Sequence, residues 1–239
     1  MHRDYHKWFS PRLNREMELL QLGHAGVPLL VFPTSMGRFF EFEDRGMANT
    51  LAPAIHAGRL SLFCVDSVDT ESFYCKWAHP SGRIRRHQQY DDYLVYEVLP
   101  LLQKRGNTHR VAVTGCSFGA YHAVNFALRH PDAVHTCAGL SGAYDIKPFL
   151  DGHYDDLCYF HNPVDSLPNL QDDWYLGRYR HDIRWILAAG EHDICLDATR
   201  RLSGIFNAKG IHHHFDCWGH GAIHDWPLWH EMIWKYFGS

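Results

Sequence analysis

The amino-acid sequence predicts an α/β fold, in which a mostly parallel sheet carries helices on both faces. Short runs of apolar, largely β-branched residues recur along the chain, as expected for strands that are buried on both sides. Stretches with apolar residues at helical spacing lie between these runs, and this alternation is typical of parallel sheets. One run ends in the pentapeptide Gly115-Cys116-Ser117-Phe118-Gly119 and is followed at once by a helical pattern.

The composition indicates one globular domain. The chain has 239 residues, 46% of them hydrophobic, which is enough to bury a sizeable core, so we treat residues 1–239 as a single domain. The net charge of −4 is spread over interspersed charges and argues against a nucleic-acid partner. No apolar run has the length of a membrane span, and the first residues lack the apolar core of a secretory signal. We expect a soluble, cytoplasmic protein with no membrane partner, either monomeric or homo-oligomeric.

Cysteine and histidine are numerous, but their spacing does not predict a metal site. The seven cysteines include no C-x-x-C pair, so we interpret them as reduced core residues. Among the twenty histidines, three are consecutive at 212–214. Side chains alternate between the faces of a strand, so only two of these three would share a side, too few for zinc. We expect no metal and no cofactor.

The first strands are expected near the N-terminus. Leu13 to Leu22 suits an edge strand, and Val27 to Phe32 suits the first interior strand. The interior strand runs into a loop of small residues at 33–38, at the strand end where open α/β sheets bind ligands. A backbone N–H in such a loop can stabilise an oxyanion. We assign this role to Ser35, with either neighbour or a plain structural turn as alternatives.

A helix and a buried strand follow. Gly46 to Gly58 has helical spacing and ends in glycine, and Leu60 to Val65 is the strand. The loop from Asp66 to Arg86 is rich in polar and aromatic residues and leaves the same edge of the sheet. Its candidate substrate-binding residues are Asp66, Asp69, Tyr74 and Trp77. The alternative is that the carboxylates cap turns and the aromatic rings pack on the sheet. Residues 88–104 then show helical spacing.

The pentapeptide at 115–119 matches the nucleophile-elbow pattern G-x-S-x-G. Such an elbow places a serine at a sharp turn between a buried strand, here Val111 to Thr114, and a helix, here Tyr121 to His130. The flanking glycines leave room for the turn, and the strained backbone exposes the hydroxyl. We predict that Ser117 is the nucleophile and that Phe118 supplies the second oxyanion N–H. An ordinary strand–helix turn is the alternative.

The chain after the elbow helix is expected to supply a cap and a catalytic acid. Residues 143–182 follow the strand Val134 to Leu140; they are aromatic and broken by Pro and Asp, which predicts short helices that cap the sheet edge. A serine nucleophile needs a histidine to take its proton and a carboxylate to orient that histidine. Asp193 fits best because it follows the strand Ile183 to Ala189 at the reactive edge. The alternative acids are Glu191 and Asp197.

The general base is expected in the loop after the last strand, Ile211 to Cys217. His220 and His224 compete for this role, because the chain order of serine, acid and histidine accepts either residue. A terminal helix follows the loop. The residues alone therefore leave the identity of the base open.

Three motifs together resemble the esterase family of α/β-hydrolases, namely Gly-Cys-Ser-Phe-Gly at 115–119, Gly-Glu-His-Asp at 190–193 and His-Asp-Trp-Pro-Leu-Trp at 224–229. This family includes S-formylglutathione hydrolase, feruloyl esterases, mycobacterial mycolyltransferases and polyhydroxyalkanoate-depolymerase-like esterases. The resemblance extends over nearly the whole chain and implies the α/β-hydrolase fold. It selects His224 as the base, because the family's histidine directly precedes Asp-Trp. The bulky Phe118 and Phe39-Phe40 depart from the pattern, so the substrate class does not carry over.

These observations predict a serine esterase that hydrolyses a small-molecule carboxylic ester. Ser117, His224 and Asp193 would form the catalytic triad, and an acyl-enzyme would be the intermediate. One alternative is an acyltransferase that passes the acyl group from the same site to an alcohol or a sugar. A catalytically silent scaffold used for binding and a histidine-based metal protein are the others.

Overall fold

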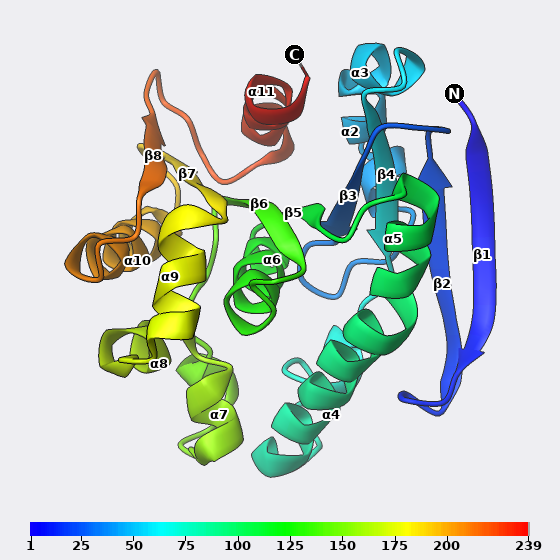
Figure 1. Ribbon diagram of the computed structural model, residues 1–239. Coiled ribbons are helices and arrows are strands. Elements are labelled where there is room, and N and C mark those ends of the chain that lie inside the picture. The colour runs from blue at the N-terminus through cyan, green and yellow to red at the C-terminus, as the bar shows by residue number, and fades with distance from the viewer. Residues whose placement is uncertain (239) are drawn as a thin grey trace.

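The computed structural model describes residues 1–238, which form an eight-stranded sheet between two layers of helices (Figure 1). The strand order is β1-β2-β4-β3-β5-β6-β7-β8. The strands are β1 (Arg3–Ser10), β2 (Arg15–Leu22), β3 (Val27–Phe32), β4 (Leu60–Val65), β5 (Val111–Cys116), β6 (Val134–Leu140), β7 (Arg184–Gly190) and β8 (His213–Trp218). β2 pairs antiparallel with β1 and β4, and all other neighbouring strands are parallel. The predicted mostly parallel α/β sheet is therefore confirmed.

The helices lie on both sides of this sheet. They are α1 (Glu41–Asp44), α2 (Met47–Thr50), α3 (Ala52–His56), α4 (Pro80–Tyr93), α5 (Leu99–Gly106), α6 (Phe118–Arg129), α7 (Asp156–Phe160), α8 (Pro163–Asn169), α9 (Asp173–His181), α10 (Leu196–Ala208) and α11 (Trp226–Phe237). Short 3₁₀ turns lie at Asp69–Glu71 and Lys147–Phe149. Within the described residues, none of these helices combines the length and the hydropathy needed to cross a bilayer.

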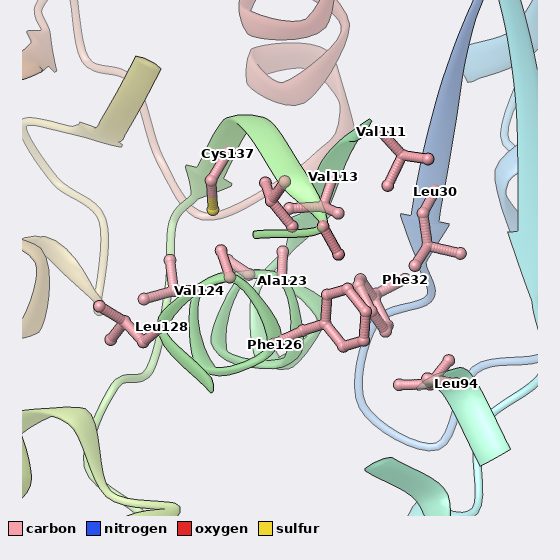
Figure 2. Close-up of a cluster of buried hydrophobic side chains, with 14 of the residues drawn as sticks. Leu30, Phe32, Leu94, Val111, Val113, Ala123, Val124, Phe126, Leu128 and Cys137 are labelled. Carbon is pink, nitrogen blue, oxygen red and sulfur yellow. The ribbon is translucent and has the colours of Figure 1, made fainter. Parts of the chain in front are cut away.

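Alternate residues of the central strands face opposite layers, as the pleat of a strand requires. Leu30 and Phe32 of β3 point into a core shared with α4, α5, α6 and α10, whereas Leu29 and Val31 point into a core shared with α2, α3 and α11. Figure 2 shows the first of these cores, where Val113 of β5 lies against α6. Both faces of β5 are thus buried, which holds its carboxyl end in a fixed position.

The edge strand was predicted at the wrong place. Residues 13–22 contain β2, but β2 is hydrogen-bonded on both sides, to β1 and to β4. The edge is β1, which pairs with β2 from Arg3↔Leu22 to Ser10↔Arg15. Most of the side chains of β1 are exposed or only partly buried, so its sequence lacks the apolar run that marks the other strands. Its charged residues suit an edge, because they discourage pairing with another chain.

Two predicted helices are interrupted by proline. The helix expected at Gly46 to Gly58 is divided into α2 and α3, and Pro53 lies in the first turn of α3. The helix expected at 88–104 begins earlier, with α4, and reaches α5 through a π-helical segment at Leu94–Val98. Pro100 lies at the start of α5, and its missing N–H removes one backbone bond from this helix. The local change in helical pitch is consistent with that loss.

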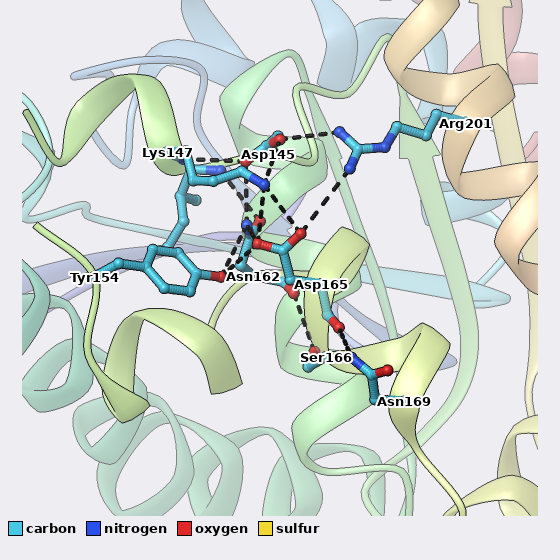
Figure 3. A network of polar contacts seen from close by, with 9 residues as sticks. Asp145, Lys147, Tyr154, Asn162, Asp165, Ser166, Asn169 and Arg201 are labelled. Carbon is cyan, nitrogen blue, oxygen red and sulfur yellow. Dashed lines mark hydrogen bonds and ion pairs between the residues drawn. The ribbon is translucent and has the colours of Figure 1, made fainter. Parts of the chain in front are cut away.

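The predicted cap segment at 143–182 contains α7, α8, α9 and a 3₁₀ turn, so the expectation of short helices is correct. A polar network joins it to α10 (Figure 3). Asp165 accepts hydrogen bonds from Lys147, at 3.0 Å, and from Asn162, at 2.8 Å, while Arg201 of α10 donates to Asp145 at 3.0 Å. These bonds hold the segment over one end of the sheet. Its role as a cap stays a prediction.

The turn between β5 and α6 has the backbone of a nucleophile elbow. Ser117 lies there with φ 57° and ψ −122°, a region that is unfavourable for any residue with a Cβ. A Cβ at Gly115 would lie 2.3 Å from the backbone of Gly119, and a Cβ at Gly119 would lie 2.4 Å from the carbonyl oxygen of Pro33. Both glycines are therefore needed for the close approach of chain segments, as predicted.

A cluster of buried histidines lies between α6, α4 and the end of α7. His87 is 2% exposed and His161 is fully buried. His161 Nδ1 accepts a hydrogen bond from the Asn125 side-chain amide at 3.0 Å, and His161 Nε2 donates to Gln88 Oε1 at 2.8 Å. Tyr121 donates to the carbonyl oxygen of His161 at 2.9 Å. Burial is the main cause that lowers the pKa of both imidazoles well below 6.5, so the folded protein holds them neutral.

We predict that these histidines make the protein sensitive to acid. Below about pH 6.5 the unfolded chain binds protons at His87 and His161, whereas the native state does not. As the pH falls, each histidine therefore lowers the free energy of unfolding by up to about 1.4 kcal/mol per pH unit, until the pH reaches the pKa of that histidine in the folded protein. His87→Phe should lose less stability than the wild type between pH 7.5 and 5.5, as measured by thermal or urea unfolding. The matched control is His56→Phe at an exposed histidine, which should follow the wild type. Equal slopes for all three proteins would contradict this prediction.

We also predict that Ser117→Gly is more stable than Ser117→Ala. Both variants lack the hydroxyl, but only glycine adopts the positive φ of this turn without steric cost. The expected difference is about 1 kcal/mol in the free energy of unfolding, measurable in urea at neutral pH. A glycine variant that is less stable than the alanine variant would show that the turn is not strained.

Candidate active site

The structure brings Ser117, His224 and Asp193 together at the carboxyl edge of the sheet. His224 Nε2 lies 3.0 Å from Ser117 Oγ, and His224 Nδ1 lies 2.8 Å from Asp193 Oδ1. Ser117 follows β5, Asp193 follows β7, and His224 directly precedes α11. Because the carboxyl ends of parallel strands meet at one edge, residues far apart in sequence become neighbours. Nδ1 donates to the carboxylate in this arrangement, which leaves Nε2 free to accept the serine proton.

The loops that carry the acid and the histidine are bonded to each other. The N–H of Glu191 donates to the carbonyl of Trp218 at 2.7 Å, and the N–H of His192 donates to the carbonyl of Ala222 at 2.9 Å. The carboxylate of Glu191 accepts from the N–H of Gly221. Asp225 caps α11 by accepting from the N–H of Trp226 at 2.7 Å. The position of the histidine is thus set by backbone bonds on both sides.

Asp193 is the only one of the three predicted acids that contacts this histidine among the described residues. It is 6% exposed and accepts from the N–H of Cys195 at 2.7 Å. Burial alone raises the pKa of the Asp193 carboxyl, but contacts with His224, Ser141 and the Cys195 N–H outweigh burial and leave the pKa below its usual value. The carboxylate is therefore ionised at neutral pH. Asp197 lies on α10 with its side chain 96% exposed, facing Arg200.

The sequence did not single out the residues that support the imidazole. The ring of Trp229 lies edge-on to that of His224, with centroids 5.1 Å apart. Its indole N–H donates to Ser141 Oγ at 2.9 Å, and Trp229 is 4% exposed. The tryptophan is part of the motif at 224–229, which was used only to choose the histidine. The signal that could have identified Trp229 is its position near the start of the terminal helix, only five residues after His224.

The loop at residues 33–38, which we call the oxyanion loop after the role predicted for it, lies against the start of α6. The N–H of Thr34 donates to Glu41 at 2.8 Å, and the N–H of Met36 donates to Asp69 at 3.0 Å. Between them, the N–H of Ser35 has no hydrogen-bond acceptor within residues 1–238. The N–H of Phe118 belongs to the first turn of α6, where helix geometry provides no acceptor. These two amides have no acceptor within residues 1–238, and their role as oxyanion donors stays a prediction.

Of the predicted substrate-binding residues, Tyr74 is partly buried and Trp77 is exposed. The hydroxyl of Tyr74 donates to Ser35 Oγ at 2.7 Å, and its ring lies edge-on to Phe118 with centroids 5.5 Å apart. Trp77 is 89% exposed. Tyr74 is therefore adjacent to the oxyanion loop, whereas Trp77 lies on the surface. A role of either residue in substrate binding stays a prediction.

The prediction that Asp66 and Asp69 line the substrate pocket is wrong for this structure. Asp69 is 1% exposed and binds His122 and the Met36 N–H. Asp66 is fully buried; burial raises the pKa of its carboxyl even though Arg38 Nε lies 2.6 Å from Oδ1. A carboxylate that has lost its water needs donors from the protein. Asp69 meets that need at both oxygens, whereas Asp66 has Arg38 at Oδ1 and no partner at Oδ2 within residues 1–238. Both acids join the loop at 66–86 to residues 36–38 and do not line an open surface.

Two groups of side chains in the described part of the chain have donor atoms close enough for a metal ion. One comprises His153, Asp155 and Cys158, and the other comprises Asp193, Cys195 and His224. The second group contains the hydrogen-bonded acid and histidine described above. Neither group includes a residue of 212–214.

Comparisons with known proteins identify the family and the fold of the chain. The sequence model of the family described as "Putative esterase" matches residues 44–236. None of the curated proteins matches the chain in sequence. Solved structures of similar fold include a ferulic acid esterase, with 15% identity, 99% of this chain and 96% of that chain covered and a TM-score of 0.79. The S-formylglutathione hydrolase of Staphylococcus aureus has 16% identity, 99% and 95% coverage and a TM-score of 0.73.

A third similar structure is fluorophosphonate-binding serine hydrolase F of Staphylococcus aureus, with 16% identity, 99% and 96% coverage and a TM-score of 0.71. At these low sequence identities the solved structures show only that the fold is shared. The family model matches most of the sequence and therefore shows family membership. The chain therefore belongs to this esterase family and has the α/β-hydrolase fold.

Proposed function

We propose that the protein hydrolyses carboxylic esters through Ser117, His224 and Asp193, by way of an acyl-enzyme. The observation that carries this proposal is the continuous hydrogen-bonded path from the serine hydroxyl to the imidazole, at 3.0 Å, and on to the carboxylate, at 2.8 Å. A serine hydroxyl is a weak nucleophile until a base accepts its proton. The path supplies that base in the correct tautomer and a buried anion to stabilise the imidazolium.

The reaction proceeds in two halves. As Ser117 Oγ attacks the carbonyl carbon, His224 Nε2 takes its proton and the C=O electron pair moves to the oxygen. The tetrahedral adduct collapses, the alkoxide leaves with the proton from His224, and an acyl-serine remains. Water then attacks the acyl-serine with His224 again as base, which releases the acid and restores the hydroxyl. No cofactor enters this scheme.

The charge that develops on the carbonyl oxygen is stabilised by the N–H groups of Ser35 and Phe118. Preorganised donors of this kind contribute strongly because they need no rearrangement when the charge appears. Bonds to Glu41 and Asp69 occupy the neighbouring amides of the oxyanion loop, which supports Ser35 as the donor. The substrate is a small-molecule ester. The fluorophosphonate-binding relative supports the choice of a probe for the serine.

We predict that Ser117→Ala and His224→Ala each lower kcat for p-nitrophenyl and hydroxycinnamate esters by at least about a thousandfold, because either change interrupts the proton path. The matched control is His220→Ala, which removes an exposed histidine of the same loop and should retain activity. A fluorophosphonate probe should label the wild type and leave Ser117→Ala unlabelled. Ester hydrolysis that survives in Ser117→Ala would contradict the mechanism.

A competing alcohol in the same assay separates hydrolysis from acyl transfer. We expect free acid as the main product, because the scheme ends with attack by water. Ester formed with the added alcohol as the main product would instead show an acyltransferase. Wild-type protein that neither turns over the ester panel nor reacts with the probe would indicate a scaffold without catalysis.

A further inference from the structure

We propose that Asp69 is a positioning residue, which fastens the oxyanion loop to helix α6 and thereby aims the Ser35 N–H at the substrate carbonyl. This inference rests on the proposed esterase function. It gives a role to a buried acid that the proton path does not use and that does not line a pocket. The other partner is His122, whose place on α6 follows Ser117 by about one and a half turns.

Both oxygens of the Asp69 carboxylate are engaged, each with a different segment. Oδ2 accepts from the N–H of Met36 at 3.0 Å, and Oδ1 lies 2.9 Å from His122 Nε2. Asp69 is 1% exposed and His122 is 3% exposed. Away from water, hydrogen bonds to a charged group are stronger than at the surface, and leaving one unmade is costly. The carboxylate is therefore a firm link between the loop and the helix.

The loop is held in a conformation that it would not adopt unaided. Met36 has φ 58°, which is uncommon for a residue with a side chain and costs on the order of 1 kcal/mol. The bond from its N–H to Asp69 offsets that cost. On the other side of Ser35, Glu41 accepts from both the N–H and the hydroxyl of Thr34 at 2.8 Å. Two carboxylates thus bind the N–H groups on either side of Ser35, whose own N–H has no acceptor within residues 1–238.

The hydrogen-bonded pair of Asp69 and His122 also contacts residues next to both proposed oxyanion donors. The ring of His122 is stacked against Phe32, at the end of β3, with centroids 5.9 Å apart. It lies edge-on to Phe118 at 4.9 Å. Phe32 precedes the oxyanion loop, and Phe118 carries the second oxyanion N–H. The contacts of Asp69 and His122 therefore add to the backbone contact at Gly119 in fixing the separation of the two donor amides.

A purely structural role would lower stability without changing how the carbonyl oxygen is recognised. The two roles are distinguished by comparing an ester with its thionoester, in which sulfur replaces the carbonyl oxygen. Sulfur is a weak hydrogen-bond acceptor, so well-aimed N–H groups favour the oxygen ester. The ratio of kcat for ester to kcat for thionoester reports on the aim of the donors and is independent of the fraction of folded protein.

The test compares Asp69→Ala with Asp91→Ala, which removes another buried aspartate paired with a histidine. Asp91 is 3% exposed and lies 3.0 Å from His130 and 3.1 Å from Arg129, away from the oxyanion loop. Both variants should lose stability. In Asp69→Ala we expect kcat for the ester to fall about tenfold to a hundredfold with KM little changed, and the ester-to-thionoester ratio to fall by a similar factor. Asp91→Ala should keep the wild-type ratio.

A measurement on the wild type keeps the proposal testable if Asp69→Ala does not fold. Amide hydrogen exchange followed by NMR should show the Met36 N–H protected at least about a hundredfold, because its acceptor is buried. An unprotected Met36 amide, or a folded Asp69→Ala variant with the wild-type ratio, would refute the role of Asp69. Activity that survives in Ser117→Ala would instead refute the esterase mechanism, so the two failures are distinguishable.

Discussion

The close approach of two backbone segments at Gly119 is the constraint on which the rest of the site depends. At this residue the first turn of α6 touches the carbonyl groups at the end of β3, with no space for a Cβ. The parallel register of β3 and β5 brings these segments to the same level of the sheet. As a consequence, the serine hydroxyl and the oxyanion loop share one small volume. The remaining groups reach it from β7 and β8, which end at the same edge.

Two residues near this volume have unfavourable backbone angles, namely Ser117 and Met36. A strained backbone of this kind persists only where contacts with the surrounding structure stabilise it by more than the strain costs. At Ser117 the surroundings are the buried strand β5 and the buried start of α6, and at Met36 they are a buried carboxylate. Positive φ also occurs at five other residues with side chains, namely Asn14, Asn107, Ser141, Asp151 and His220. Ser117 and Met36 differ from most of these because each lies at the carboxyl end of a central strand, next to the predicted site.

The sequence predicted the elements whose signals are local. A buried strand that is followed by G-x-S-x-G specifies its own turn, and the motif at 224–229 distinguishes His224 from His220 without three-dimensional information. The prediction failed where a signal depends on distant partners. The side chains of β1 are mostly exposed, so no apolar run marks it as a strand, and only its pairing with β2 defines it. Asp69 and Asp66 lie in a polar, aromatic loop of the kind that lines pockets. Nothing in the sequence around them reveals that their carboxylates are buried against His122 and Arg38.

The backbone bonds between the acid loop and the histidine loop have a consequence for how the site responds to heat. Because Glu191 and His192 are bonded to residues 218–222, we expect thermal motion to displace Asp193 and His224 together. The serine belongs to the junction of β5 and α6, and the hydrogen bond that joins it to the imidazole is the one that the proposed mechanism would break and remake. We therefore expect warming to lengthen the distance from the hydroxyl to the ring before it changes the distance from the ring to the carboxylate.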